Sequence, residues 1–168
     1  GASLTVAGRP LIFNATQTLT GSHTHDWVEV RGGALTIAGG TTLTVTGSLS
    51  LFSGSLITGT LAAEGDINAH IGFVGGGTAT LLINGAGAQT LTGFHSAAAG
   101  SMPNVNVAKP SGTLTIAGTL RTARNWTYTS CALSDAGSTV IFNGTLTLTG
   151  THALKRVEFH PGDVPVHA

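Results

Sequence analysis

Charged side chains are scarce in this sequence, and so are cysteines, aromatic residues and long apolar runs. Only 8% of the 168 residues are charged, and seven basic and seven acidic side chains give a formal net charge of zero. A protein that binds nucleic acid needs a basic face for the phosphates, so the composition argues against nucleic acid as a partner. No apolar run of about 18 residues occurs, which predicts that the chain has no membrane span.

Cys131 is the only cysteine, which excludes an internal disulfide and a metal site built from several cysteines. The chain begins with GASLTV, without a methionine or a signal peptide. We therefore expect a processed chain or a segment of something longer.

Apolar residues instead recur at every second position in short runs, and many of the 25 glycines stand between these runs. Examples are Leu35-Thr36-Ile37, Leu43-Thr44-Val45 and Leu49-Ser50-Leu51. No stretch combines a helical period of 3.6 residues with helix caps. The pattern predicts an all-β protein, which leaves a sandwich, a barrel or a β-solenoid open.

One motif is repeated three times: an apolar pair and asparagine, then Leu-Thr-Gly-x-His, then a short apolar strand. Its asparagines, Asn14, Asn84 and Asn143, are 70 and 59 residues apart. An internal repeat favours a parallel β-helix, or β-solenoid, with repeats of about 60–70 residues and about twenty residues in each coil. We expect a single solenoid domain over 1–168, with units at about 10–79, 80–138 and 139–168, and with 1–9 as the end of a preceding unit.

The alternation also predicts which side chains point inward. Polar residues between them, including Glu29, Asn106 and Glu158, are expected to face solvent. The predicted inward residues are Val28, Val30, Ile37, Val45, Leu51, Ile57, Val105, Val107, Ile116, Ile141, Val157 and Phe159.

The stretches IFNGT at 141–145, Leu-Thr-Gly-x-His and SGTLTIAGTL at 111–120 resemble the β-strand repeats of large secreted or surface-attached bacterial proteins. Those repeats are similar to haemagglutinin-like and autotransporter β-helices. The resemblance implies a right-handed parallel β-helix at the cell surface or outside the cell, with a structural or adhesive role. It carries over no catalytic residue.

The repeated histidines, His23, His95 and His152, suggest either a shared site or one structural position that recurs. Strands stack about 4.8 Å apart, so equivalent positions three coils apart are separated by roughly 14 Å. A metal needs its nitrogen ligands at about 2 Å. We therefore expect each histidine to be a corner residue that closes a local hydrogen bond.

The segment HTHD at 23–26 is a separate candidate. On a strand, His23 and His25 point to the same face and Asp26 lies beside them, and two such imidazoles can chelate zinc, copper or nickel. A zinc site usually takes three or four protein ligands, however, and the other units lack the second histidine. We interpret these residues as surface histidines and expect no metal and no cofactor.

Two alternatives involve carbohydrate. A β-helix enzyme that cleaves polysaccharide needs converging carboxylates, and among the seven acids only Glu64 and Asp66 share a strand face. A glycan-binding module could stack sugars on Trp27, Trp126 or Tyr128, but these residues are scattered and are expected to pack against the protein. We expect no enzyme activity, and keep a carbohydrate-active enzyme or a glycan-binding module as the alternative.

Thr-x-Thr strands such as TLTVTG at 42–47 and TLTLTG at 145–150 allow a third alternative, an ice-binding protein. Such a face needs the motif in register on nearly every coil, and the sequence has it on about half of the coils. Threonine is also a good strand former in its own right.

The sequence therefore favours a non-enzymatic, extracellular or cell-surface solenoid that acts as an adhesive stalk or spacer, or as the subunit of a self-assembling filament. An uncovered coil presents unpaired backbone groups to another chain. We expect end-to-end self-association, or contact with neighbouring repeats of a longer chain, and a surface glycan as a further possible partner. The predicted assembly edge consists of Leu4, Thr5, Val6, Val164 and Val166.

Overall fold

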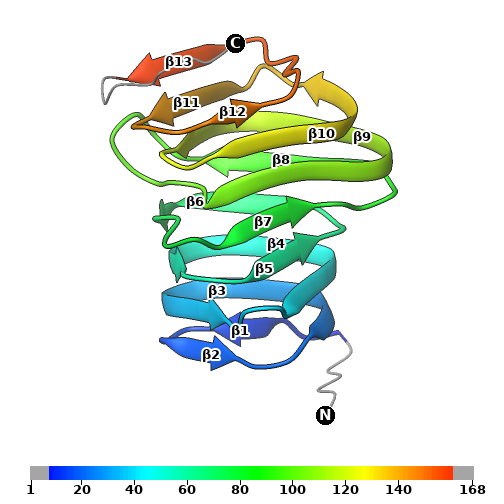
Figure 1. Ribbon diagram of the computed structural model, residues 1–168, viewed down its shortest axis with the longest axis vertical. Helices are drawn as coiled ribbons and strands as arrows, with labels where there is room; N and C mark the ends of the chain where they lie inside the picture. The colour runs from blue at the N-terminus through cyan, green and yellow to red at the C-terminus, as the bar shows by residue number, and fades with distance from the viewer. Residues whose placement is uncertain (1–7, 161–168) are drawn as a thin grey trace.

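The computed structural model describes residues 8–160, and over that range the chain is a stack of coils made only of strands and turns (Figure 1). The stack has about eight turns, and every pair of strands is parallel, which confirms the predicted all-β parallel solenoid. The strands are β1 (Leu11–Phe13), β2 (Gln17–Leu19), β3 (His23–Ile37), β4 (Thr42–Leu56), β5 (Thr60–Ala63), β6 (Ile67–Phe73), β7 (Thr80–Ile83), β8 (Gln89–Phe94), β9 (Asn104–Thr122), β10 (Trp126–Asp135), β11 (Thr139–Asn143), β12 (Leu148–Thr149) and β13 (Val157–His160).

Successive coils pair along three ladders, which we call the first, second and third faces in chain order. The first face contains β1, β6 and β8, with the middle parts of β3, β4 and β9 and the last residues of β10. The second face contains β2, β11 and β13, with the last residues of β3, β4 and β9. The third face contains β5, β7 and β12, with the first residues of β3, β4, β9 and β10.

Coil length varies along the stack. Paired strand residues are 17 positions apart at Leu11 and Val28, and 25 positions apart at Leu91 and Ile116. The long strands β3, β4 and β9 continue around corners, so one strand serves more than one face.

Like side chains stack on like in the interior. On the third face Leu43, Leu61 and Leu81 occupy one inward column, and all three are fully buried. Burying one such side chain contributes about 1.5–3 kcal/mol, so aliphatic columns hold the coils together. Eight of the predicted inward residues are confirmed as members of this core: Val28, Val30, Ile37, Val45, Leu51, Val105, Val107 and Ile116.

Two inward predictions are wrong by one position. Ile57 is only half-buried, and its neighbour Leu56 belongs to the core instead. Ile141 is buried, but the core contains Val140 and Phe142 on either side of it. In both places two or three adjacent residues are apolar, so the alternation did not decide which of them turns inward.

The last coil also departs from expectation. Val157 and Phe159 are in register with the core residues Val140 and Phe142, as an inward position requires, yet they are 37% and 51% exposed. Within residues 8–160, β13 pairs only with β11. Their direction is therefore as predicted, but no described strand covers them.

One corner is closed by glycines at Gly47, Gly65 and Gly85. A Cβ atom on Gly65 would lie 1.7 Å from the carbonyl oxygen of Gly47, and one on Gly85 would lie 2.0 Å from that of Glu64. Successive coils therefore approach each other here more closely than any larger residue allows.

The repeated asparagines do not share one structural position. Asn14 follows β1 on the first face, Asn84 follows β7 on the third face, and Asn143 ends β11 on the second face. Because coils differ in length, copies 70 and 59 residues apart do not fall a whole number of turns apart. The division into units at 10–79, 80–138 and 139–168 stays a prediction about sequence similarity.

Candidate functional site

His23 and His25 share a strand face, as predicted, but that face is the interior. They pair with the core residues Leu43 and Val45, and His25 is buried while Asp26 is exposed. His23 donates a hydrogen bond from Nε2 to the Thr20 carbonyl oxygen at 2.9 Å. Burial lowers the pKa of His25, and the neighbouring His23 lowers it further.

A metal bound by His23 and His25 would need further ligands. Among the described residues, no group of three or more histidine, cysteine, aspartate or glutamate side chains is placed to hold one. The expectation that His23 and His25 are surface histidines is wrong for His25, because β4 covers it from the next coil.

The other two repeated histidines lie in different surroundings. His95 follows β8 and is buried, and its Nδ1 accepts a hydrogen bond from the backbone N–H of Arg121 at 2.9 Å. His152 packs edge-on against Tyr128, with ring centroids 5.8 Å apart. A local corner bond is therefore found at His23, whereas His95 bonds to the next coil, and the three do not share one position.

Two of the glutamates form ion pairs with neighbouring arginines. Glu29 is buried, contrary to prediction, because Ile12 and Ser50 flank it in the adjacent coils and Arg31 forms an ion pair with it at 2.5 Å. Glu158 is half-buried and pairs with Arg156 at 2.9 Å, and it also contacts His160. Neither of these two glutamates is placed as a free acid.

The pair Glu64 and Asp66 lies at an exposed corner between β5 and β6. Asp66 accepts a hydrogen bond from the backbone N–H of Thr90 at 2.8 Å. Asp135 likewise accepts bonds from the backbone of Ser138 and Lys155, and the Lys155 bond is the main reason why its pKa is lowered. Both aspartates thus tie one coil to the next turn.

Buried Lys109 is a feature that the sequence reasoning missed. Its ammonium donates hydrogen bonds to the carbonyl oxygens of Gly85 and Gly87 at 2.6 and 3.0 Å, and to Gln89 Oε1 at 2.5 Å. Burial lowers the pKa of Lys109. Because the ammonium is surrounded by oxygens that belong to one corner, we assign it a structural role in holding that corner.

The predicted aromatic candidates do not form a platform. Trp126 is buried in the core, Tyr128 is partly buried against it, and Trp27 is 40% exposed. The structure instead stacks Phe52, His70 and Phe94 on the outer surface.

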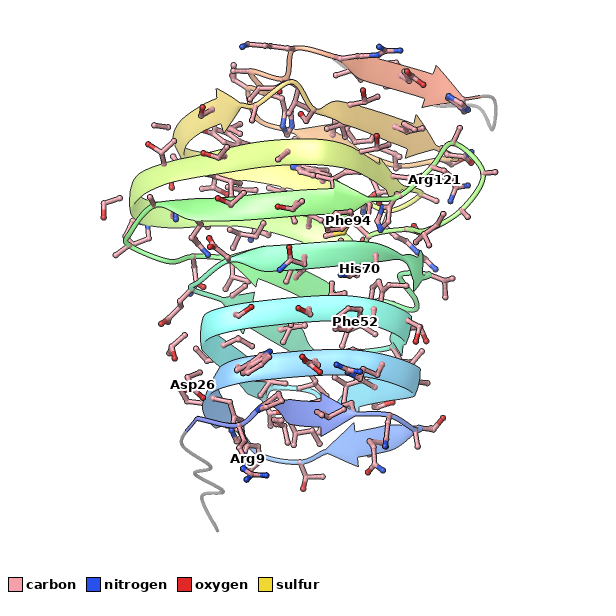
Figure 2. The ribbon with its side chains drawn as sticks, turned by 180° about the vertical axis from the view of Figure 1, so that it is seen from behind. Arg9, Asp26, Phe52, His70, Phe94 and Arg121 are labelled. Atoms are coloured by element: carbon pink, nitrogen blue, oxygen red, sulfur yellow. The ribbon has the colours of Figure 1, made fainter. Side chains whose placement is uncertain are left out.

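Figure 2 shows these three side chains above one another on β4, β6 and β8. Ring centroids are 4.4 Å apart for Phe52 and His70, and 4.8 Å apart for His70 and Phe94. The Arg31 guanidinium lies 4.9 Å from the Phe52 centroid and continues the stack. The ring faces are turned toward each other, so this column joins coils rather than offering a face to a sugar. Only the coil register, which the sequence does not show, brings the four residues together.

The Thr-x-Thr motifs are divided among faces. Thr42 and Thr44 lie on the third face, as do Thr147 and Thr149 close to or within β12, whereas Thr90 and Thr92 lie on the first face. The third face also carries a shallow depression of about 280 Å³ across β7, β9 and β10. It is lined by Thr80, Asn104, Val105, Asn106, Asn125 and Thr127.

The C-terminal end of the described stack has an apolar surface. Phe159 stacks on the core residue Phe142 with ring centroids 5.6 Å apart, and no described strand covers its other side. The predicted edge residues Leu4, Thr5, Val6, Val164 and Val166 lie outside the described residues.

The chain matches no protein-family model, no curated protein and no solved structure. Within residues 8–160, no helix is long and apolar enough to cross a membrane. The solenoid fold agrees with the fold that the resemblance to bacterial surface repeats implies. The location and the adhesive role that it also implies are proposals.

Proposed function

We propose that the protein is a non-enzymatic structural solenoid that acts outside the cell and associates end to end. The observation that supports this proposal best is the open core at β13, where Val157 and Phe159 continue the inward columns of Val140 and Phe142 but remain 37% and 51% exposed. Apolar side chains in core positions, at a sheet edge that no described strand pairs, favour a further layer of strand.

Each end of the described stack has a second-face strand with a described partner on one side only. At the N-terminal end, β2 pairs only with β3 among the described strands, and at the other end β13 pairs only with β11. Both strands belong to the second face, and both run in the same direction as the rest of the ladder. A second copy can therefore continue the parallel ladder, and because the two contacting surfaces differ, the contact propagates as a filament.

The adhesive stalk and the rigid spacer are consistent with the same architecture. Long columns of buried aliphatic side chains give a stack whose length grows with the number of coils. The extracellular location is suggested by the resemblance of the repeats to those of secreted and surface-attached proteins.

The association is tested with Phe159→Lys. A lysine at this edge places a charge against the incoming strand, so light scattering and negative-stain images should show long species for the wild type and short ones for the variant. Phe94→Lys is the matched control, because Phe94 is 50% exposed but lies on the side of the stack. A wild-type chain that stays a monodisperse monomer at high concentration would rule out end-to-end association and leave the spacer.

A further inference from the structure

The depression on the third face is formed by residues from three successive coils. Thr80 of β7 pairs with Asn104 of β9, and Asn106 of β9 pairs with Thr127 of β10. The hollow lies between these two rows, because Val105 turns its side chain into the core and leaves only backbone at the floor. Figure 1 shows the three strands as neighbours in the stack.

Part of the polar lining is held in place by the protein itself. Asn104 donates from Nδ2 to the Ala79 carbonyl oxygen at 3.0 Å, and its Oδ1 accepts from the Asn125 backbone N–H at 3.3 Å. Asn125 Oδ1 in turn accepts from the backbone N–H of Thr147 at 2.9 Å. These bonds fix the orientation of both amides, so a ligand would not have to order them.

Other donors and acceptors remain free. The hydroxyls of Thr80 and Thr127 and the Nδ2 atoms of Asn106 and Asn125 have no hydrogen-bond partner among the described residues. Hydroxyl and amide groups can both donate and accept, as sugar hydroxyls do. None of the six lining residues is charged, which favours a neutral ligand.

We propose that this depression is a binding site for a unit of a neutral polysaccharide that lies along the third face. Its volume of about 280 Å³ is close to the lower limit of roughly 300 Å³ for enclosed small-molecule pockets, so it fits one part of an extended chain. The row on one side of the hollow continues over six coils, which at about 4.8 Å each spans roughly 24 Å. This row consists of Thr42, Thr60, Thr80, Asn104, Asn125 and Thr147.

An ordered layer of water is the competing use of such a face. The second row argues against it, because Ala62 and Leu82 interrupt the hydroxyls and amides two residues along from Thr60 and Thr80. Regular Thr-x-Thr therefore does not repeat on successive coils, whereas a local polar hollow suits a discrete ligand. The site lies on the side of the stack, so the inference does not depend on end-to-end association.

The test is titration calorimetry with neutral hexasaccharides: cellohexaose, maltohexaose, xylohexaose and mannohexaose. The double variant Thr80→Val and Thr127→Val keeps the shape and the β-branching but removes two hydroxyls, so we expect binding of the preferred sugar to weaken by about tenfold. The control is Thr92→Val with Thr115→Val, which removes two half-buried threonine hydroxyls from the first face and should leave affinity unchanged.

Three results would overturn the proposal. The first is that none of the four sugars binds the wild type. The second is equal weakening in the test and control variants, since the site would then not be the third-face hollow. The third is thermal hysteresis that the Thr80 and Thr127 variant loses while no sugar binds, which would assign the face to water instead.

Discussion

At the scale of single residues, the protonation of His95 makes the stability of the folded state depend on pH. Burial lowers the pKa of its imidazole to about 4, and the nearby Arg121 and His70 contribute in the same direction through their charges. Nδ1 accepts the backbone N–H of Arg121, which it can do only without a proton. The native state therefore requires the neutral ring, whereas in the unfolded chain the same ring has its ordinary pKa of 6.5.

Stability should consequently fall on mild acidification. Below pH 6.5 the unfolded chain takes up a proton that the native chain refuses until about pH 4, so lowering the pH from 7.5 to 5.0 should cost about 2 kcal/mol through His95 alone. His25 and His152 add to this loss, because the pKa of each is also lowered by burial.

The measurement is the free energy of unfolding in urea at both pH values. His95→Gln keeps an acceptor for the Arg121 amide without a titrating ring, so its loss of stability between the two pH values should be smaller than that of the wild type. Equal losses in the two proteins would show that His95 does not titrate as argued.

At the scale of strands and corners, close packing between coils depends on glycine where one turn crosses another. Gly65→Ala places a methyl group 1.7 Å from the Gly47 carbonyl oxygen, so backbone must move and stability should fall by about 3 kcal/mol. Gly39→Ala is the control, since a Cβ there meets nothing within 4 Å, and it should be neutral or slightly stabilising. Urea unfolding compares the two, and equal midpoints would contradict a close-packed corner.

The internal repeat and the resemblance favoured parallel coils, and the alternating pattern predicted most of their inward valines, leucines and isoleucines. It failed where the answer depends on the neighbouring coil. Glu29 was expected in solvent and is buried, because the coil register places Ile12 and Ser50 on either side of it and Arg31 of the same strand forms an ion pair with it. Coil length is the missing quantity, since paired residues of successive coils lie 17 to 27 positions apart.

The unknown coil length is also the reason why the candidate sites could not be predicted from the sequence. Phe52, His70 and Phe94 are 18 and 24 positions apart, so no fixed period connects them in the sequence. The third-face hollow likewise combines Thr80 with Asn104 and Asn125, which share no motif. Conversely, the motif that the sequence does repeat places its asparagines on three different faces.

At the scale of the whole molecule, a solenoid is nearly one-dimensional, and each coil is stabilised by the coils on either side. Within the described stack, β13 has a strand on one side only, whereas β4 pairs with β3 on one side and with β5 and β6 on the other. In dilute solution, amide hydrogens of β13 and β12 should therefore exchange with solvent faster than those of β4 and β9.

End-to-end association predicts a second, more specific feature of hydrogen exchange: its dependence on protein concentration. Joining two copies pairs β13 with a new strand and covers Phe159, so raising the protein concentration should slow exchange in β13 and leave β4 and β9 unchanged. Hydrogen exchange followed by mass spectrometry at two concentrations measures this directly. Phe159→Lys should remove the dependence on concentration, while Phe94→Lys should keep it. Protection that rises in the side-facing β8 alone would place the contact on the flank of the stack, and protection that rises equally in all strands would show no contact specific to β13. Either result would contradict a filament built coil upon coil.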